Sequence, residues 1–131
     1  MPLSKEKKEQ IRCFLEKVRH AVDMFSNDQS IIHVYDRKEF TDTISFFCWK
    51  MDDVLDILYN LNAGDYYRGP TDNRNNPNLP QVWEFNYHYR GRDIYIKLSY
   101  GDHNEGKDSL LILSMHIDRI DLFRMRKRGA L

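Results

Sequence analysis

The alternation of apolar and polar residues between Val82 and Ile117 predicts three consecutive β-strands, at 82–89, 94–98 and 110–116. Because neighbouring side chains on a strand point to opposite faces, one face of this sheet is predicted to be apolar and the other polar. The predicted apolar face carries Trp83, Phe85, Tyr87, Tyr89, Ile94, Ile96, Leu98, Leu111, Leu113 and Met115, and the polar face carries Glu84, Asn86, His88, Tyr95, Lys97, Ser114 and His116. A carboxylate, two imidazoles, a phenol and an ammonium on one face of a small sheet predict a functional site.

Helical periodicity dominates the first half of the chain. The apolar residues Ile11, Phe14, Leu15, Val18, Val22 and Phe25 recur at helical spacing and predict an amphipathic helix over residues 4–26, with Ser4 as its N-cap. Residues 31–35 are short and β-branched, which is typical of a strand or an extended segment. Two further helical patterns cover about 40–47 and 51–61, and Gly64 is expected just past the end of the second.

Residues 65–80 are dense in Gly, Pro, Asn and Asp and are predicted to form a long loop, which is usually functional or mobile. Helices followed by a strand meander favour an α+β fold, with the N-terminal helices packed on one face of a small antiparallel sheet. We expect a single domain over residues 1–131, with a helical part at about 4–64, a sheet at about 82–117 and a basic C-terminal tail at about 118–131.

The charges of the chain cancel, since 20 basic residues balance 20 acidic ones. Net charge therefore gives no argument for nucleic-acid binding, and any such argument depends on where the charges lie. The N-terminal run at 5–8 and the tail are basic, which fits either solvated helix faces or attraction to phosphate.

Only two cysteines are present, Cys13 and Cys48, and neither belongs to a CxxC pair. Together with the lack of a secretory apolar segment at the start, this favours reduced thiols and a cytoplasmic location. No window approaches the roughly 18 uninterrupted apolar residues of a membrane span. The histidines show no metal-binding spacing, so neither a metal nor another cofactor is expected.

Four segments follow one another at the boundaries of these predicted elements: Asp65-Tyr66-Tyr67-Arg68-Gly69-Pro70, Val82-Trp83-Glu84-Phe85, Asp93-Ile94-Tyr95-Ile96-Lys97-Leu98 and Leu111-Ile112-Leu113-Ser114-Met115-His116. Together they resemble the motility quorum-sensing regulator (MqsR) toxins of bacterial toxin-antitoxin pairs, whose fold is similar to that of RelE. The resemblance covers about residues 51–117. It implies a RelE-like ribonuclease that cuts messenger RNA without a metal, leaves a 2′,3′-cyclic phosphate and is neutralised by a cognate antitoxin.

By motif position, the resemblance assigns functional roles to Arg68, Glu84, Tyr95 and His116. Two of these positions depart from the best-known family member. Glu84 is acidic where that member has an amide, and His116 is an imidazole where it has a lysine. The departures leave open which residue acts as the acid and which as the base.

The chemistry of RNA cleavage supports the same residues. Attack by the 2′-hydroxyl needs a base, cations that hold the phosphate, and an acid for the leaving oxygen. Arg68 offers a bidentate fork, Lys97 a point charge and His116 a group that titrates near neutrality. Tyr95 can donate a hydrogen bond or stack on a base, and Glu84 can accept the 2′-proton. Contacts to single-stranded RNA are expected from Tyr67, Arg68, Lys97, Arg124 and Arg126.

Each of these residues also has a structural explanation. Lys97 can pair with Glu84 across the sheet, His116 can be a structural imidazole, and Arg68 can pair with Asp65 or Asp72 in a turn. The alternatives to a toxin are therefore a non-catalytic RNA- or protein-binding module and a decayed toxin kept for regulation. The apolar stripe of the first helix either docks on the sheet or stays partly open to receive the antitoxin.

Overall fold

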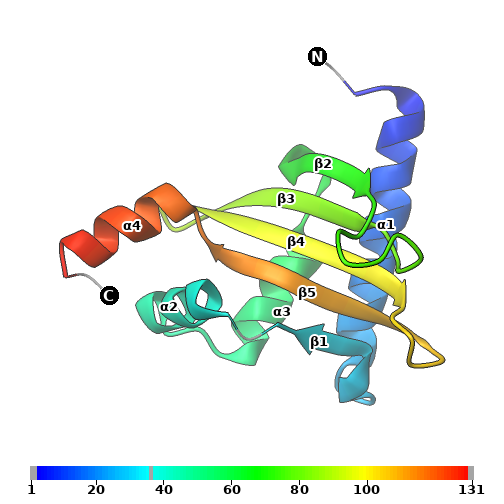
Figure 1. The fold of residues 1–131 in the computed structure, drawn as a ribbon, viewed down its shortest axis with the longest axis horizontal. Helices are drawn as coiled ribbons and strands as arrows, with labels where there is room; N and C mark the ends of the chain where they lie inside the picture. The colour runs from blue at the N-terminus through cyan, green and yellow to red at the C-terminus, as the bar shows by residue number, and fades with distance from the viewer. Residues whose placement is uncertain (1–2, 36, 130–131) are drawn as a thin grey trace.

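A five-stranded sheet with helices packed on one face confirms the predicted α+β class (Figure 1). The computed structural model describes residues 3–35 and 37–129. The strands lie in the order β1-β5-β4-β3-β2. Their bounds are β1 (Ile32–Val34), β2 (Tyr66–Thr71), β3 (Val82–Tyr89), β4 (Arg92–Asp102) and β5 (Asp108–Ile117). The three predicted strands are thus confirmed as β3, β4 and β5, and the last two extend further than predicted.

The predicted helices are present as α1 (Lys5–Met24), α2 (Lys38–Phe47) and α3 (Met51–Asn60). Ser4 caps α1 as predicted, because its side chain accepts a hydrogen bond from the Lys7 backbone N–H at 3.0 Å. The expectation that α3 ends next to Gly64 was wrong by three residues. Leu61 already leaves helical geometry, and Asn62 caps a separate 3₁₀ turn, Ala63–Asp65, by accepting from the Gly64 N–H.

The prediction of an antiparallel sheet holds for four of the strands and fails for β1. This strand pairs with β5 in the parallel direction, with Ile32 opposite Leu110 and Val34 opposite Ile112, so the sheet is mixed. The short segment was itself predicted, but its partner was not, because the pairing joins residues about eighty positions apart in the chain. No local pattern specifies such a contact.

Residues 66–71 were predicted to be part of a long loop and instead form the edge strand β2. Pro70 is compatible with a strand only at an edge, where no ladder partner needs its missing N–H. Gly69 lies so close to β3 that an added Cβ would lie 2.8 Å from the Val82 carbonyl oxygen. The Gly-Pro pair that suggested a loop therefore allows this strand to pack tightly on β3, and the remaining loop spans 72–81.

A β-bulge in β5 corrects the predicted apolar face of the sheet. Lys97 of β4 lies opposite Ser114 and Leu98 lies opposite Ile112, so Leu113 is an extra residue between them. From this point towards the start of β5, the alternation is reversed relative to the sequence prediction. Leu110 and Ile112 are buried in the core, whereas Leu111 and Leu113 belong to the opposite face.

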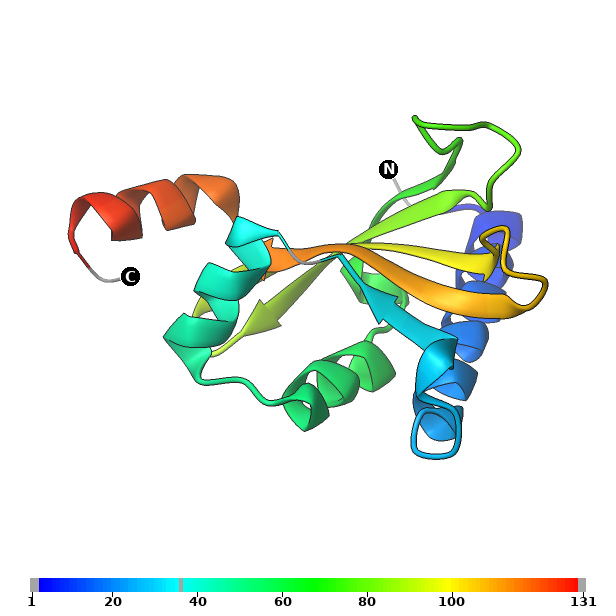
Figure 2. The same cartoon turned by 60° about the horizontal axis from the view of Figure 1, so that its bottom comes forward.

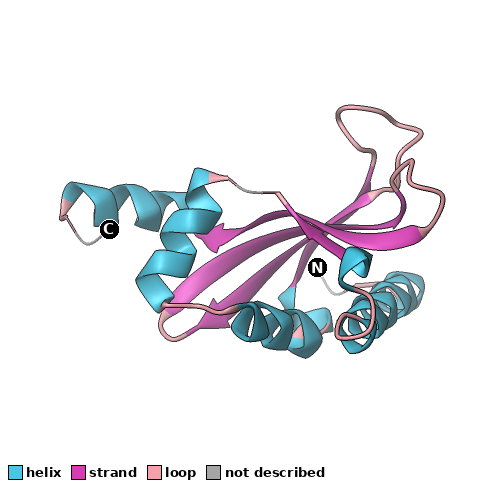
Figure 3. Cartoon of the chain, turned by 90° about the horizontal axis from the view of Figure 1, so that it is seen from below, coloured by secondary structure: helices cyan, strands magenta, loops and turns pink. Residues whose placement is uncertain are grey.

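Helix α1 docks on the sheet through the apolar stripe found in the sequence. Ile11 and Val18 are fully buried, and Phe14 stacks on Trp83 with ring centroids 4.8 Å apart. Figure 2 and Figure 3 show α1 and α3 side by side on one face, while the 72–81 loop rises from the other face. The expectation that the apolar stripe of α1 docks on the sheet is therefore confirmed. The polar face of the sheet stays free of these helices.

The basic tail, for which the sequence left a solvated helix face and attraction to phosphate open, contains the helix α4 (Arg119–Lys127), capped by the Asp118 side chain. On one side of α4, Leu122 and Met125 are buried, whereas Ile120 and Phe123 are exposed. The last two residues of the predicted tail, 130 and 131, lie outside the described residues. Over the described ranges, no helix is long and apolar enough to cross a membrane.

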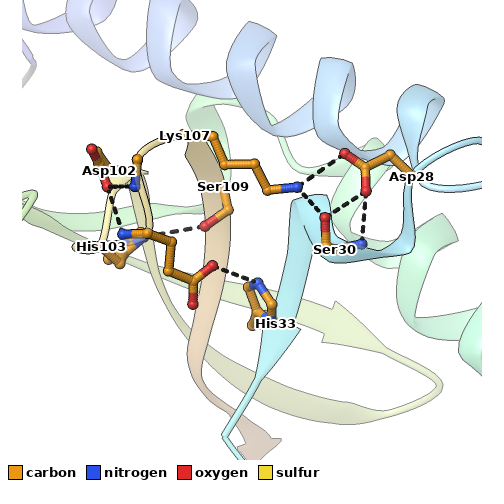
Figure 4. A network of polar contacts seen from close by, with 9 residues as sticks. Asp28, Ser30, His33, Asp102, His103, Lys107 and Ser109 are labelled. Carbon is orange, nitrogen blue, oxygen red and sulfur yellow. Dashed lines mark hydrogen bonds and ion pairs between the residues drawn. The ribbon is translucent and has the colours of Figure 1, made fainter.

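Polar contacts tie the β4–β5 hairpin to β1 and to the segment that precedes β1 (Figure 4). The Lys107 ammonium donates to Asp28 at 3.2 Å and to the Ser30 hydroxyl, and His33 lies 3.5 Å from Glu105. These contacts fix the hairpin end of β5 beside β1. They lie away from the polar residues singled out in the sequence.

Candidate active site

The exposed face of the sheet carries a cavity of about 520 Å³ between β2 and the start of α4. Its walls include Tyr67, Arg68, Glu84, Tyr95, Lys97 and His116, which are six of the eight residues predicted to form the site. The remaining lining residues are Arg37, Arg74, Asn86, Ser114, Asp118 and Arg119. The strand register explains this gathering, because Glu84 lies opposite Lys97, Lys97 opposite Ser114, and Tyr95 opposite His116.

Glu84 is the centre of the polar network in this cavity. It is 3% exposed, and its two carboxylate oxygens accept hydrogen bonds from different partners, the Arg68 guanidinium Nε and the Tyr95 hydroxyl. Arg68 is held opposite Glu84 by two register shifts that flank it in β2. The Arg68 side chain is 56% exposed and is tethered through Nε, and its terminal nitrogens make no hydrogen bond or ion pair among the described residues.

The charge state of this network follows from its contacts. Burial acts to raise the pKa of Glu84, but the hydrogen bonds from Arg68 and Tyr95 outweigh it and hold that pKa below its ordinary value. Burial and the bond to Glu84 raise the pKa of Tyr95. Glu84 is therefore a carboxylate near neutral pH, and Tyr95 is a phenol that donates its proton to it.

Lys97 differs from Arg68 because its ammonium has no hydrogen-bond or ion-pair partner among the described residues. Desolvation lowers the pKa of Lys97, and the nearby cations Arg74, Arg37 and Arg68 lower it further, while Glu84 opposes them. A lysine with a lowered pKa gives up a proton more easily than an exposed one. Lys97 and Glu84 face each other across the β3–β4 ladder. They form no direct hydrogen bond or ion pair in the described part of the chain, so the pairing offered as a structural explanation of Lys97 is limited to this register position.

His116 reaches the cavity wall but is only 3% exposed. Its Nδ1–H donates to the Ile117 carbonyl at 2.8 Å, which leaves Nε2 as the nitrogen with a lone pair in the neutral ring. Nε2 is buried without a hydrogen-bond partner among the described residues. Burial lowers the pKa of His116, so the ring is neutral at pH 7. The ring packs against Tyr95, with centroids 5.5 Å apart.

Three arginines that sequence reasoning missed also line the cavity. Arg37 lies just before α2, Arg74 in the 72–81 loop and Arg119 at the start of α4. With Arg68 and Lys97 they bring five cationic side chains to one cavity that holds two carboxylates, Glu84 and Asp118. Only the position of Arg119 in the basic tail gave any signal in the sequence.

The two tail arginines that were predicted to bind RNA do not line this cavity. Arg126 donates to Asp42 of α2 through its Nε at 3.1 Å, and Arg124 is exposed further along α4. His88, also predicted on the polar face, lies outside the cavity and pairs with Asp93 at 3.2 Å. Tyr67, by contrast, is 56% exposed and lies 5.6 Å from the Arg68 guanidinium, at the rim.

Within the described ranges, no group of three or more His, Cys, Asp or Glu side chains is placed to hold a metal ion. No family model matches the chain, and comparisons with curated proteins and with solved structures find no match either. The resemblance to the MqsR toxins therefore depends on the sequence motifs alone.

Proposed function

We propose that this protein is a metal-independent endoribonuclease that cuts single-stranded messenger RNA by attack of the 2′-hydroxyl. The observation that carries the proposal is the convergence of five cationic side chains with Glu84, Tyr95 and His116 around one cavity, in a chain of zero net charge. Cations in an otherwise balanced protein mark where an anion binds. Cleavage of an RNA phosphodiester requires both an anion-binding site and groups that act as acid and base.

In the proposed mechanism, the terminal nitrogens of Arg68 grip the scissile phosphate, and Arg74 and Arg119 neutralise its charge. The Glu84 carboxylate accepts the proton of the 2′-hydroxyl through a remaining lone pair. The 2′-oxygen then attacks phosphorus, the bond to the 5′-oxygen breaks, and Lys97 donates a proton to that oxygen. The products are a 2′,3′-cyclic phosphate and a 5′-hydroxyl. Tyr95 orients Glu84, and His116 packs behind Tyr95.

Cleavage of a 5′-labelled single-stranded RNA by purified protein tests this proposal. We expect internal cuts that persist in EDTA and end in a 2′,3′-cyclic phosphate, detected by mass spectrometry of the products. Lys97→Gln protein, purified in parallel, controls for a contaminating nuclease. Abolition of cleavage by EDTA, or an equal rate for the variant, contradicts the proposal.

One structural observation favours the alternative, a non-catalytic RNA-binding module. Both Glu84 oxygens already accept a hydrogen bond, and His116 Nε2 is buried. A binding module with this face would hold RNA with a strong salt dependence and leave it intact. Tight binding without any cleavage of RNA in the first experiment supports this alternative.

We further propose that the protein is the toxin of a toxin-antitoxin pair and acts in the cytoplasm, where messenger RNA is present. The support is the set of four motifs that resemble the MqsR toxins. Induced expression should stop growth, and co-expression of the neighbouring gene should restore it. The Lys97→Gln variant should leave growth unaffected at the same expression level.

A further inference from the structure

A second depression of about 360 Å³ adjoins the candidate active site on the same face of the sheet. The two share Arg37, Arg68, Arg74, Glu84, Lys97 and Ser114 as wall residues, so a ligand can extend from one into the other. The walls that belong to the second depression alone come from Tyr35 just after β1, the end of β2, the 72–81 loop, the start of β3 and the bulged part of β5. The proposed mechanism uses none of these residues.

The floor of this depression is apolar because of the β-bulge. Leu113 is the extra residue of β5, and the bulge turns its side chain out of the core and into the depression beside Val82. A bulge that redirects a side chain next to a polar cavity is a feature found repeatedly at functional sites. Three arginines and Lys97 outnumber the two carboxylates, Asp72 and Glu84, in the walls around this apolar floor. The depression therefore suits a ligand that combines a flat apolar surface with negative charge.

One wall of the depression is aromatic and the other offers amide groups. Tyr35 is 42% exposed, and the guanidinium of Arg37 lies 5.7 Å from its ring. Opposite the strands, Asn75 of the loop lines the depression. The Asn75 side-chain amide makes no hydrogen bond within residues 3–35 and 37–129, although its backbone N–H donates to Asn73 at 3.0 Å. Its donor and acceptor are therefore open to a ligand.

We propose that this depression binds a nucleobase of single-stranded RNA, adjacent to the phosphate held by Arg68. The proposal depends on the proposed function for the neighbouring phosphate. Leu113 and Tyr35 contact the faces of the base, and Asn75 hydrogen-bonds its edge, because an asparagine amide matches the paired donor and acceptor of a base. The depression would thus determine which base lies beside the cleaved bond.

Binding of 2′-O-methyl hexanucleotides measures this subsite without cleavage, because the methyl group blocks the attacking oxygen. Fluorescence anisotropy gives the Kd of labelled hexamers of each of the four bases and of an abasic hexamer with the same backbone. For wild-type protein, at least one base should bind about tenfold more tightly than the abasic hexamer, as expected for one stacked base. Tyr35→Ala and Asn75→Ala should each reduce this ratio while leaving the Kd of the abasic hexamer nearly unchanged.

Tyr59→Ala is the matched control, since Tyr59 lies on α3 and is also 42% exposed. It should keep the wild-type ratio. A wild-type protein that binds the abasic hexamer as tightly as all four others contradicts the subsite, as does full discrimination in both Tyr35→Ala and Asn75→Ala. Base-dependent binding without any RNA cleavage would retain the subsite and remove the nuclease. Cleavage without base-dependent binding would support the nuclease and contradict the subsite.

Discussion

Arg68 and Glu84 are register partners across the β2–β3 ladder, and their ion pair joins an exposed guanidinium to a buried carboxylate. The asymmetry gives the two groups different tasks. Glu84 is held in place by Arg68 and Tyr95, whereas Arg68 keeps its terminal nitrogens for a ligand. The contact therefore tethers the guanidinium that is proposed to hold the phosphate, and it leaves that guanidinium exposed at the cavity.

The first prediction separates the fork of Arg68 from its charge. Arg68→Ala should slow RNA cleavage by on the order of a hundredfold, the usual cost of losing one donor to a developing anion. Arg68→Lys keeps the charge but loses the planar fork, so it should recover only part of that loss. Single-turnover rates on one RNA measure both variants. An Arg68→Lys protein with the wild-type rate would show that only charge matters at this position.

The second prediction concerns proton donation by Lys97. Lys97→Gln should lower the single-turnover rate by roughly a hundredfold, the typical contribution of one general acid. The pKa of Lys97 is lowered, so the wild-type rate should fall with rising pH in a limb that begins below the ordinary value of 10.5. The variant should lack this limb, because it has no proton to lose.

Lys8→Gln is the control for this pH profile, because Lys8 is an exposed lysine of α1. It should retain both the rate and the alkaline limb. If the limb also persists in Lys97→Gln, another group supplies the proton.

How far the sequence predicts this site is clear from individual residues. Periodicity placed Glu84, Tyr95, Lys97 and His116 on one face correctly, because β3, β4 and the part of β5 after the bulge are regular in this region. It failed at Leu113, where one extra residue reverses the alternation, and a bulge has no reliable signature in a run of apolar residues. Arg37 and Arg74 were missed because they reach the face from distant loops, and only the tertiary fold brings them there.

The third prediction compares two arginines of α4. Arg119 lines the cavity and Arg124 does not. Each phosphate contact with single-stranded nucleic acid adds about 0.7 to the slope of log K against log salt concentration. Arg119→Ala should therefore reduce that slope by about 0.7 in a filter-binding salt series. Arg124→Ala should leave it unchanged, and equal losses in the two variants would indicate a diffuse basic surface instead of a defined site.

The fourth prediction uses the burial of His116. Its pKa is lowered in the folded protein from an ordinary value of 6.5, so the unfolded chain binds more protons in the window below that value. The contribution of His116 to the free energy of unfolding should therefore be complete above pH 6.5. The free energy of unfolding should fall as the pH drops below this value, by at most about 1.4 kcal/mol per pH unit for one group.

His116→Asn tests this assignment, because asparagine can still donate to the Ile117 carbonyl but does not titrate. Urea unfolding at pH 7.5, 6.5 and 5.5 should give a shallower pH dependence for the variant. His103, whose pKa is also lowered by burial, is present in both proteins, so the difference between them isolates His116. Identical pH dependences would assign the effect to other groups.

The last prediction concerns the docked stripe of α1. Val18 is fully buried between α1 and the rest of the core, so Val18→Asp loses its apolar burial and places an unpaired carboxylate there. Together these effects should lower the free energy of unfolding by on the order of 4 kcal/mol. His20→Asp, two residues away on the exposed face of α1, should stay near wild type. Urea unfolding of both variants measures the difference. Val18→Asp with wild-type stability would mean that α1 can leave the sheet, and the stripe would then be available to an antitoxin.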